Sequence, residues 1–111
     1  MPQAQFVHGD ALELPFEDGA FERLFASYFY CHLEEAARER FLAEARRVAQ
    51  ELVVVASVLR DDDEPERWEE RVLSDGSRWT VFKRCFTGDD LAAELHGELA
   101  YRSRYFLVVR A

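Results

Sequence analysis

A thiol and an imidazole stand side by side at Cys31 and His32, a combination of side chains that can serve nucleophilic catalysis or metal binding. Adjacent residues at the end of a strand point in different directions, so we do not expect these two to act as a catalytic pair. A zinc site would need further ligands at close spacing. The remaining candidates form no CxxC or HxxxH pattern; they are His8, Cys85 and His96. We therefore expect no metal site.

Carboxylates and aromatic side chains are the other groups that could do chemistry. Asp10 follows a short apolar-leaning segment, and its carboxylate could bind a ligand or simply hold the turn after it. The acidic run at residues 61–64 lacks the spacing of a calcium loop, so we expect a solvated loop. Four aromatic residues could line a substrate pocket, fill the core or form an interface, and the sequence leaves these alternatives open; they are Trp68, Trp79, Phe82 and Phe86.

The elements that position these groups begin with strands and a helix. Residues 5–8 predict a short strand, Pro15 blocks a helix in the loop that follows, and Phe21 to Ser27 predict a second strand. Residues 34–49 carry apolar side chains at three-to-four-residue spacing, which predicts a helix. Residues 52–58 are a β-branched run without alternation, typical of a strand covered on both faces. A strand, a helix and a buried strand form a parallel βαβ unit, so the fold class is α/β.

The second half of the chain is less regular. The Asp75-Gly76 pair between two apolar-dotted segments favours a hairpin over residues 68–83, and a short helix at residues 66–73 leading into a strand is the alternative. Thr87 is a candidate N-cap for a short helix that Gly97 would end. Residues 98–101 and 105–109 predict a C-terminal antiparallel hairpin.

Composition excludes several classes of protein. The chain has 111 residues, 22 acidic and 14 basic, for a net charge of −8, which suits one domain and argues against a protein that grips nucleic acid. No apolar run reaches the about 18 residues that a membrane span needs. The first residues show no basic segment or apolar core of an export signal, so we expect a cytoplasmic protein with free thiols at Cys31 and Cys85.

Three segments together resemble the class I S-adenosylmethionine-dependent methyltransferases. The stretch GDALELPFEDGAF (residues 9–21) is similar to the family's GDAxxLPFxDxxFD segment. SYFYCHL (residues 27–33) and FLAEARRV (residues 41–48) resemble its next loop and its FLxExxRV helix. The resemblance implies a partial Rossmann-like fold, a mixed sheet with a parallel βαβ unit and a C-terminal antiparallel hairpin. It also implies S-adenosylmethionine as cofactor and a small-molecule acceptor of the methyl group.

The resemblance also implies roles for individual residues. Asp10 matches the carboxylate that accepts a hydrogen bond from the adenine amine, Ala11 the backbone N–H at the ring, and Leu12 the apolar contact. Ser27 begins the loop that lines the methyl and substrate end. His32, at the other end of this loop, is the candidate general base, because histidine titrates nearest neutral pH.

One departure from the family concerns the cofactor. The Gly-rich turn of the GxGxG type and the acidic residue after the next strand are absent before Gln5. We therefore interpret residues 1–111 as a single truncated methyltransferase-like domain, inactive as this chain alone. We expect a homodimer through the strand edge Phe21 to Ser27, which would lack its neighbour; the other possibility is that the chain is a fragment of a complete enzyme. A non-catalytic interaction or dimerisation domain is the alternative function.

Overall fold

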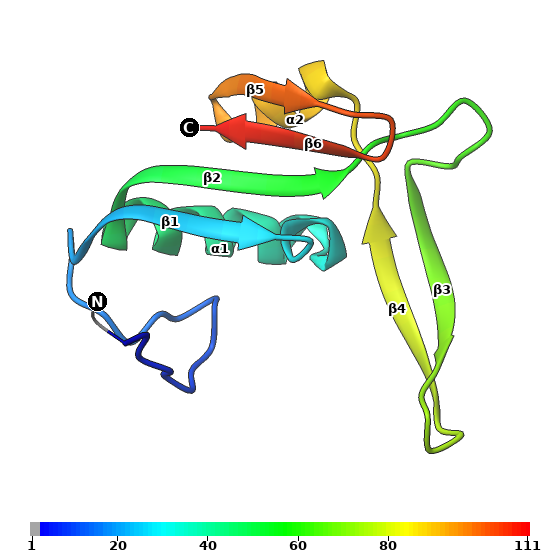
Figure 1. Ribbon diagram of the computed structural model, residues 1–111, viewed down its shortest axis with the longest axis horizontal. Helices are drawn as coiled ribbons and strands as arrows, with labels where there is room; N and C mark the ends of the chain where they lie inside the picture. The colour runs from blue at the N-terminus through cyan, green and yellow to red at the C-terminus, as the bar shows by residue number, and fades with distance from the viewer. Residues whose placement is uncertain (1–2) are drawn as a thin grey trace.

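The computed structural model describes residues 3–111 and contains two separate sheets (Figure 1). Met1 and Pro2, the start of the segment that shows no export signal, lie outside the described residues. The elements in chain order are β1 (Phe21–Ser27), the 3-10 helix η1 (Tyr30–His32), α1 (Glu35–Val48), β2 (Ala49–Ser57), β3 (Glu66–Val72), β4 (Arg78–Arg84), α2 (Gly88–Leu95), β5 (Glu98–Arg102) and β6 (Phe106–Arg110). In the part of the chain that is described, no helix is long and apolar enough to cross a membrane.

The larger sheet has the strand order β1-β2-β6-β5. β1 pairs in parallel with β2, from Phe21 opposite Ala49 to Ser27 opposite Val55. β6 is antiparallel to both β2 and β5. This confirms the predicted fold class, a mixed sheet with a parallel βαβ unit and a C-terminal antiparallel hairpin.

Helix α1 lies within one residue of its prediction at each end. Its acidic first turn holds Glu35 and its last turn holds Arg46 and Arg47, which suits the helix dipole at both ends. Its buried stripe includes Phe41, 2% exposed, and Ala45, fully buried, as the apolar spacing predicts. Arg38 is also on this stripe and is only 4% exposed, which the sequence analysis did not anticipate.

The two helices cover one face of the large sheet (Figure 1). The core on that face joins α1 and α2 to alternate residues of the strands, among them Leu52, Val54 and Ala56. The opposite face, called here the open face, carries Phe25, Val53, Val55 and Val108, which the strand register brings together. Phe25 is 63% exposed, and no helix of residues 3–111 covers it. The prediction of a strand sandwiched by helices is therefore wrong: helices cover one face of β2 only, although Val55 on the open face is just 8% exposed.

Strands β3 and β4 form a hairpin that extends away from the large sheet and is called here the arm (Figure 1). The turn holds Gly76 at φ 86°, a conformation that favours glycine. The predicted hairpin is thus confirmed, and the alternative helix at residues 66–73 is wrong. The four aromatic residues divide by position: Phe82 and Phe86 are buried, at 9% and 1% exposure, whereas Trp68 and Trp79 lie exposed on the arm.

Two local predictions need correction. Residues 5–8 form no strand, and Phe6 is 96% exposed, because no other described strand lies beside them to accept their backbone hydrogen bonds. Thr87 caps α2 as predicted, accepting a hydrogen bond from the Asp90 amide at 3.1 Å. The left-handed residue that ends α2 is His96, at φ 53°, rather than Gly97. Gly97 instead allows a close approach of strands, since a Cβ there would lie 2.4 Å from the Arg110 carbonyl oxygen.

Candidate functional site

The carboxylate of Asp10 stabilises the turn in the loop that carries it. Asp10 Oδ1 accepts a hydrogen bond from the Leu12 amide at 2.9 Å, and its carbonyl accepts one from Glu13 at 3.0 Å. Asp10 is exposed, and Ala11 and Leu12 are half-buried against the core. Both interpretations of Asp10 thus remain chemically compatible: the residue holds the turn, and its carboxylate faces solvent where a ligand can reach it.

An ion pair on α1 holds the next residues of this loop in place. Glu44 Oε2 accepts a hydrogen bond from the Leu14 amide at 2.7 Å. Arg47 donates to the Leu14 and Phe16 carbonyls at 2.9 and 2.7 Å and pairs with Glu44 at 2.9 Å. The Arg47 hydrogen bond, followed by that from Leu14, lowers the pKa of Glu44 to about 2. The loop is therefore fixed to the helix by charged groups that remain ionised at neutral pH.

The second predicted segment lies at the carboxyl end of β1. Ser27 ends the strand and is exposed, and the Tyr28 amide donates to the Val55 carbonyl at 2.9 Å. Tyr28 itself has φ 54°, the left-handed region, which costs a non-glycine residue about 1 kcal/mol. The chain then turns sharply into η1. Such backbone strain concentrates at functional sites, which supports a functional role for the segment that begins at Ser27.

His32 is oriented by the arm. Its Nδ1 lies 2.9 Å from the Phe82 carbonyl oxygen on β4. Because a carbonyl oxygen can only accept, Nδ1 carries the proton, and in the neutral ring Nε2 is left with a free lone pair. Cys31 by contrast is fully buried, and burial raises the pKa of its thiol. The two neighbours thus have different environments, and a Cys31–His32 catalytic pair is not formed.

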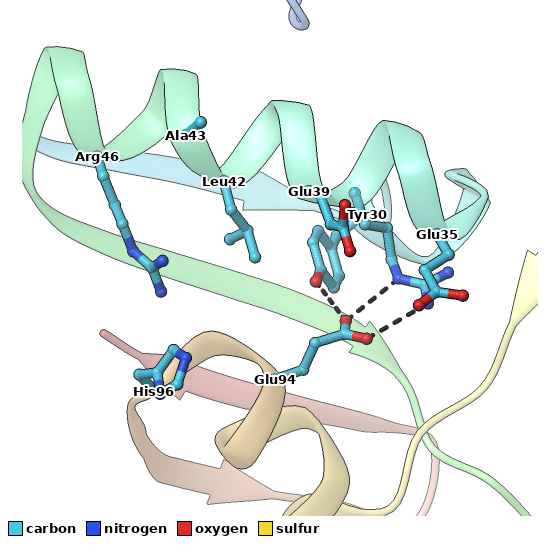
Figure 2. Close-up of a pocket in the computed structure, with 9 residues that line it drawn as sticks. Tyr30, Glu35, Glu39, Leu42, Ala43, Arg46, Glu94 and His96 are labelled. Carbon is cyan, nitrogen blue, oxygen red and sulfur yellow. Dashed lines mark hydrogen bonds and ion pairs between the residues drawn. The ribbon is translucent and has the colours of Figure 1, made fainter.

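A buried network anchors η1 to both helices (Figure 2). The Tyr30 hydroxyl donates to the Glu94 carboxylate of α2, which also accepts from Arg38 Nε at 3.2 Å and Nη2 at 3.3 Å. Arg38 Nη1 donates to the Leu33 carbonyl at 2.9 Å. Burial, with the Glu94 contact second, raises the pKa of Tyr30 far above its ordinary value, so the phenol keeps its proton. This network borders a cavity of about 400 Å³ between α1 and α2.

The structure therefore brings the predicted residues to two places along α1. Asp10, Ala11 and Leu12 belong to the loop held by Glu44 and Arg47. Ser27 and His32 flank the segment anchored through Arg38, and within residues 3–111 no hydrogen bond joins the two segments. The residues that hold both segments are not predicted from the sequence. The one available signal was Arg38, a charged side chain on the apolar stripe of a predicted helix.

Comparison with known proteins identifies the family. The model of the family described as "Methyltransferase domain" matches residues 1–56, just over half of the 111 residues. A curated relative, ajmaline N-methyltransferase from Rauvolfia serpentina, is 35% identical over an alignment of 78 residues, and the match covers 64% of this chain and 26% of that protein. The chain therefore belongs to the methyltransferase domain family.

Solved structures agree on the fold. A DhpI–SAM–HEP complex has a TM-score of 0.78 at 20% identity, covering 96% of this chain and 56% of that one. The 1,6-didemethyltoxoflavin-N1-methyltransferase of Burkholderia thailandensis has a TM-score of 0.69 at 17% identity, covering 96% and 49%. The fold is thus that of the Rossmann-like class I methyltransferases, as the resemblance implied. The chain spans about a quarter of the curated relative and about half of these two structures.

Proposed function

We propose that residues 1–111 form a truncated methyltransferase-like domain, the adenine side and acceptor side of an S-adenosylmethionine-dependent methyltransferase. The observation that carries this proposal is the family match over residues 1–56, which contains both candidate segments. Asp10 would accept a hydrogen bond from the adenine amine, Ala11 would offer its backbone N–H, and Leu12 would pack on the ring. Ser27 would line the methyl end of the site.

The reaction we propose is methyl transfer to a small molecule. When bound, S-adenosylmethionine would supply a methyl group on a positively charged sulfur, which the acceptor's lone pair would displace, with the carbon–sulfur electrons staying on sulfur to give S-adenosylhomocysteine. The acceptor's proton passes to His32 Nε2, the nitrogen left unprotonated by the Phe82 contact. A small-molecule acceptor is supported by the relatives' names, which include ajmaline and 1,6-didemethyltoxoflavin. Positioning contributes most of the acceleration in such a displacement.

Calorimetric titration of S-adenosylhomocysteine into the 111-residue chain tests the adenine site. Asp10→Ala removes both the adenine acceptor and the turn, whereas Asp10→Asn keeps an oxygen for the Leu12 amide. We expect each variant to bind about tenfold more weakly, the equivalent of one hydrogen bond of about 1.4 kcal/mol. Asp61→Ala, an exposed carboxylate in a distant loop, is the matched control. Unchanged affinity in both Asp10 variants would contradict the assignment of Asp10 to the adenine site.

We further propose that this chain is inactive alone and forms a homodimer through β1. Two features support this: the outer edge of β1 has no neighbouring strand among residues 3–111, and Phe25 is 63% exposed on the open face. The same features favour the second candidate function, a non-catalytic interaction or dimerisation domain. The two buried free thiols, Cys31 and Cys85, fit the reducing cytoplasm, where we place the protein.

Light scattering during gel filtration tests the dimer. We expect wild-type chain at micromolar concentration to be dimeric, and Phe25→Glu to be monomeric because a buried charge opposes the pairing. Trp79→Glu is the matched control, since Trp79 is similarly exposed, at 59%, but lies on the arm. Monomeric wild-type protein would refute the dimer. Dimeric protein that does not bind S-adenosylhomocysteine would favour the non-catalytic function.

A further inference from the structure

A second cavity lies at the carboxyl end of β2, and we call it the β2 pocket. Its volume is about 290 Å³, and its lining comes from β2, the turn after it, the base of the arm and the β5–β6 turn. Figure 1 shows that these segments come together at the carboxyl end of β2. Backbone hydrogen bonds fix its frame: Phe86 N to Ser57 O at 3.1 Å and Val58 N to Tyr105 O at 3.2 Å. Its polar lining comprises Ser57, Arg60, Asp63, Arg67, Lys83 and Tyr105.

The charge of the β2 pocket is opposite to that of the chain. The protein carries a net charge of −8, yet three cations and one carboxylate line this cavity. Asp63 is already engaged, because it pairs with Arg67 at 3.7 Å and accepts from the Arg60 amide at 3.2 Å. Arg67 also pairs with Glu69 at 2.5 Å, so Arg60 and Lys83 are the two cations of the pocket that no salt bridge within residues 3–111 includes. Such a concentration of one sign in a concave site attracts anions.

Lys83 is the cation with the least compensation. It is half-buried on β4, and within residues 3–111 its ammonium takes part in no ion pair or side-chain hydrogen bond. Arg60 packs its guanidinium over the Tyr105 ring, with its Cζ 5.0 Å from the ring centroid. Because Arg67 is already paired, a partly desolvated Lys83 ammonium and the Arg60 guanidinium are the two cations that an anion in the pocket would stabilise.

The β2 pocket lies beside the acceptor side of the proposed site. Ligands of open α/β sheets bind outside the carboxyl ends of the parallel strands, and β1 and β2 end together near Ser27 and Ser57. His32 contacts the Phe82 carbonyl on β4, and Lys83, which lines the β2 pocket, is the next residue of that strand. We propose that the β2 pocket binds a doubly charged oxyanion on the methyl acceptor, with the chemistry of a phosphate monoester. The inference rests on the proposed methyltransferase function only in so far as it identifies the bound anion as part of the methyl acceptor.

Titration of the 111-residue chain with inorganic phosphate, followed by amide NMR shifts, tests the pocket without any cofactor. At about pH 8 phosphate is largely dianionic, and sodium chloride is held constant to screen general attraction. We expect saturable shifts at Val58 and Lys83, and about tenfold weaker binding in Lys83→Gln, the loss of one charged contact. Lys83→Arg should retain binding. Arg102→Gln, an exposed cation on β5, gives the same charge change outside the pocket and should bind as wild type.

Acetate and S-adenosylhomocysteine complete the test. Acetate, singly charged, should bind at least about tenfold more weakly than phosphate. Phosphate should leave the calorimetric affinity for S-adenosylhomocysteine unchanged. Absence of saturable shifts, binding indifferent to Lys83→Gln, or acetate binding as tightly as phosphate would overturn the oxyanion pocket. Competition between phosphate and S-adenosylhomocysteine would overturn its assignment to the acceptor. The proposed function fails separately, if S-adenosylhomocysteine itself does not bind.

Discussion

Tyr30→Phe is the substitution whose effect the structure defines most sharply. Tyr30 is fully buried, and its ring packs against Phe41 and Phe86 at centroid distances of 6.1 and 5.8 Å, contacts that phenylalanine keeps. The change therefore removes only the hydroxyl that donates to Glu94. A buried hydrogen bond to a charged group contributes about 1.5–3 kcal/mol. Because the Glu94 side chain is 33% exposed, water can replace part of this, and we expect a loss of about 1–2 kcal/mol.

Urea unfolding followed by circular dichroism measures this loss. The double-mutant cycle of Tyr30→Phe with Glu94→Ala, which removes the acceptor, should give a coupling free energy of about 1 kcal/mol, since the two residues share one contact. Tyr101→Phe, a matched change at a residue 56% exposed, should leave stability within about 0.5 kcal/mol of wild type. The reasoning is refuted if Tyr30→Phe destabilises no more than Tyr101→Phe does.

The same variant separates anchoring of η1 from general stability. The amides of His32 and Leu33 bond to the Phe29 and Tyr30 carbonyls at 3.0 and 3.2 Å. Their hydrogen exchange should accelerate in Tyr30→Phe more than exchange in the α1 core. Because the pKa of Tyr30 is raised in the folded state, its stabilisation is complete below about pH 10 and declines above it. Tyr30→Phe should lack that alkaline decline.

Three further predictions concern the loop, the cap and the close glycine. The lowered pKa of Glu44 means that its stabilisation is present above pH 4.5 and is lost as pH falls toward about 2; Glu44→Gln should lack this acid dependence in far-ultraviolet circular dichroism titrations. Thr87→Ala should lower the free energy of unfolding in urea by about 1 kcal/mol, and Thr87→Ser should restore it. Gly97→Ala should lower it by about 1–3 kcal/mol through the clash with the Arg110 carbonyl, and an unchanged value would contradict the close approach.

Local patterns predicted most of the elements. The strand at Phe21–Ser27 agrees at both ends, and the spacing of α1 and the Asp75-Gly76 turn each marked the correct structure. The strand predicted at residues 5–8 does not form, because a strand needs a neighbour to accept its hydrogen bonds. The prediction that helices cover both faces of β2 was wrong for a similar reason: a β-branched run shows that both faces are apolar, but not what covers them.

The candidate site likewise has a part that the sequence predicts and a part that it does not. The family resemblance located the segments of Asp10 and His32, because these are contiguous in sequence. The contacts that hold them span long separations, 30 residues from Leu14 to Glu44 and 64 from Tyr30 to Glu94. No periodicity links residues so far apart. The cationic β2 pocket was hidden for the same reason, since the turn before the arm, the arm itself and the β5–β6 turn each contribute to it.

The arm's attachment has a consequence for how the chain can vary. At its base a hydrogen bond joins Cys85 N to Pro65 O at 2.8 Å, and Val58 and Phe86 form a bridge next to it. The chain thus leaves the large sheet and returns at almost the same point. Because the entropy of closing a loop rises only slowly with its length, residues added or removed at the turn end of the arm, away from Phe82 and Lys83, would hardly affect the sheet. The turn end of the arm can therefore vary in length, while its base is constrained by the contact of Phe82 with His32.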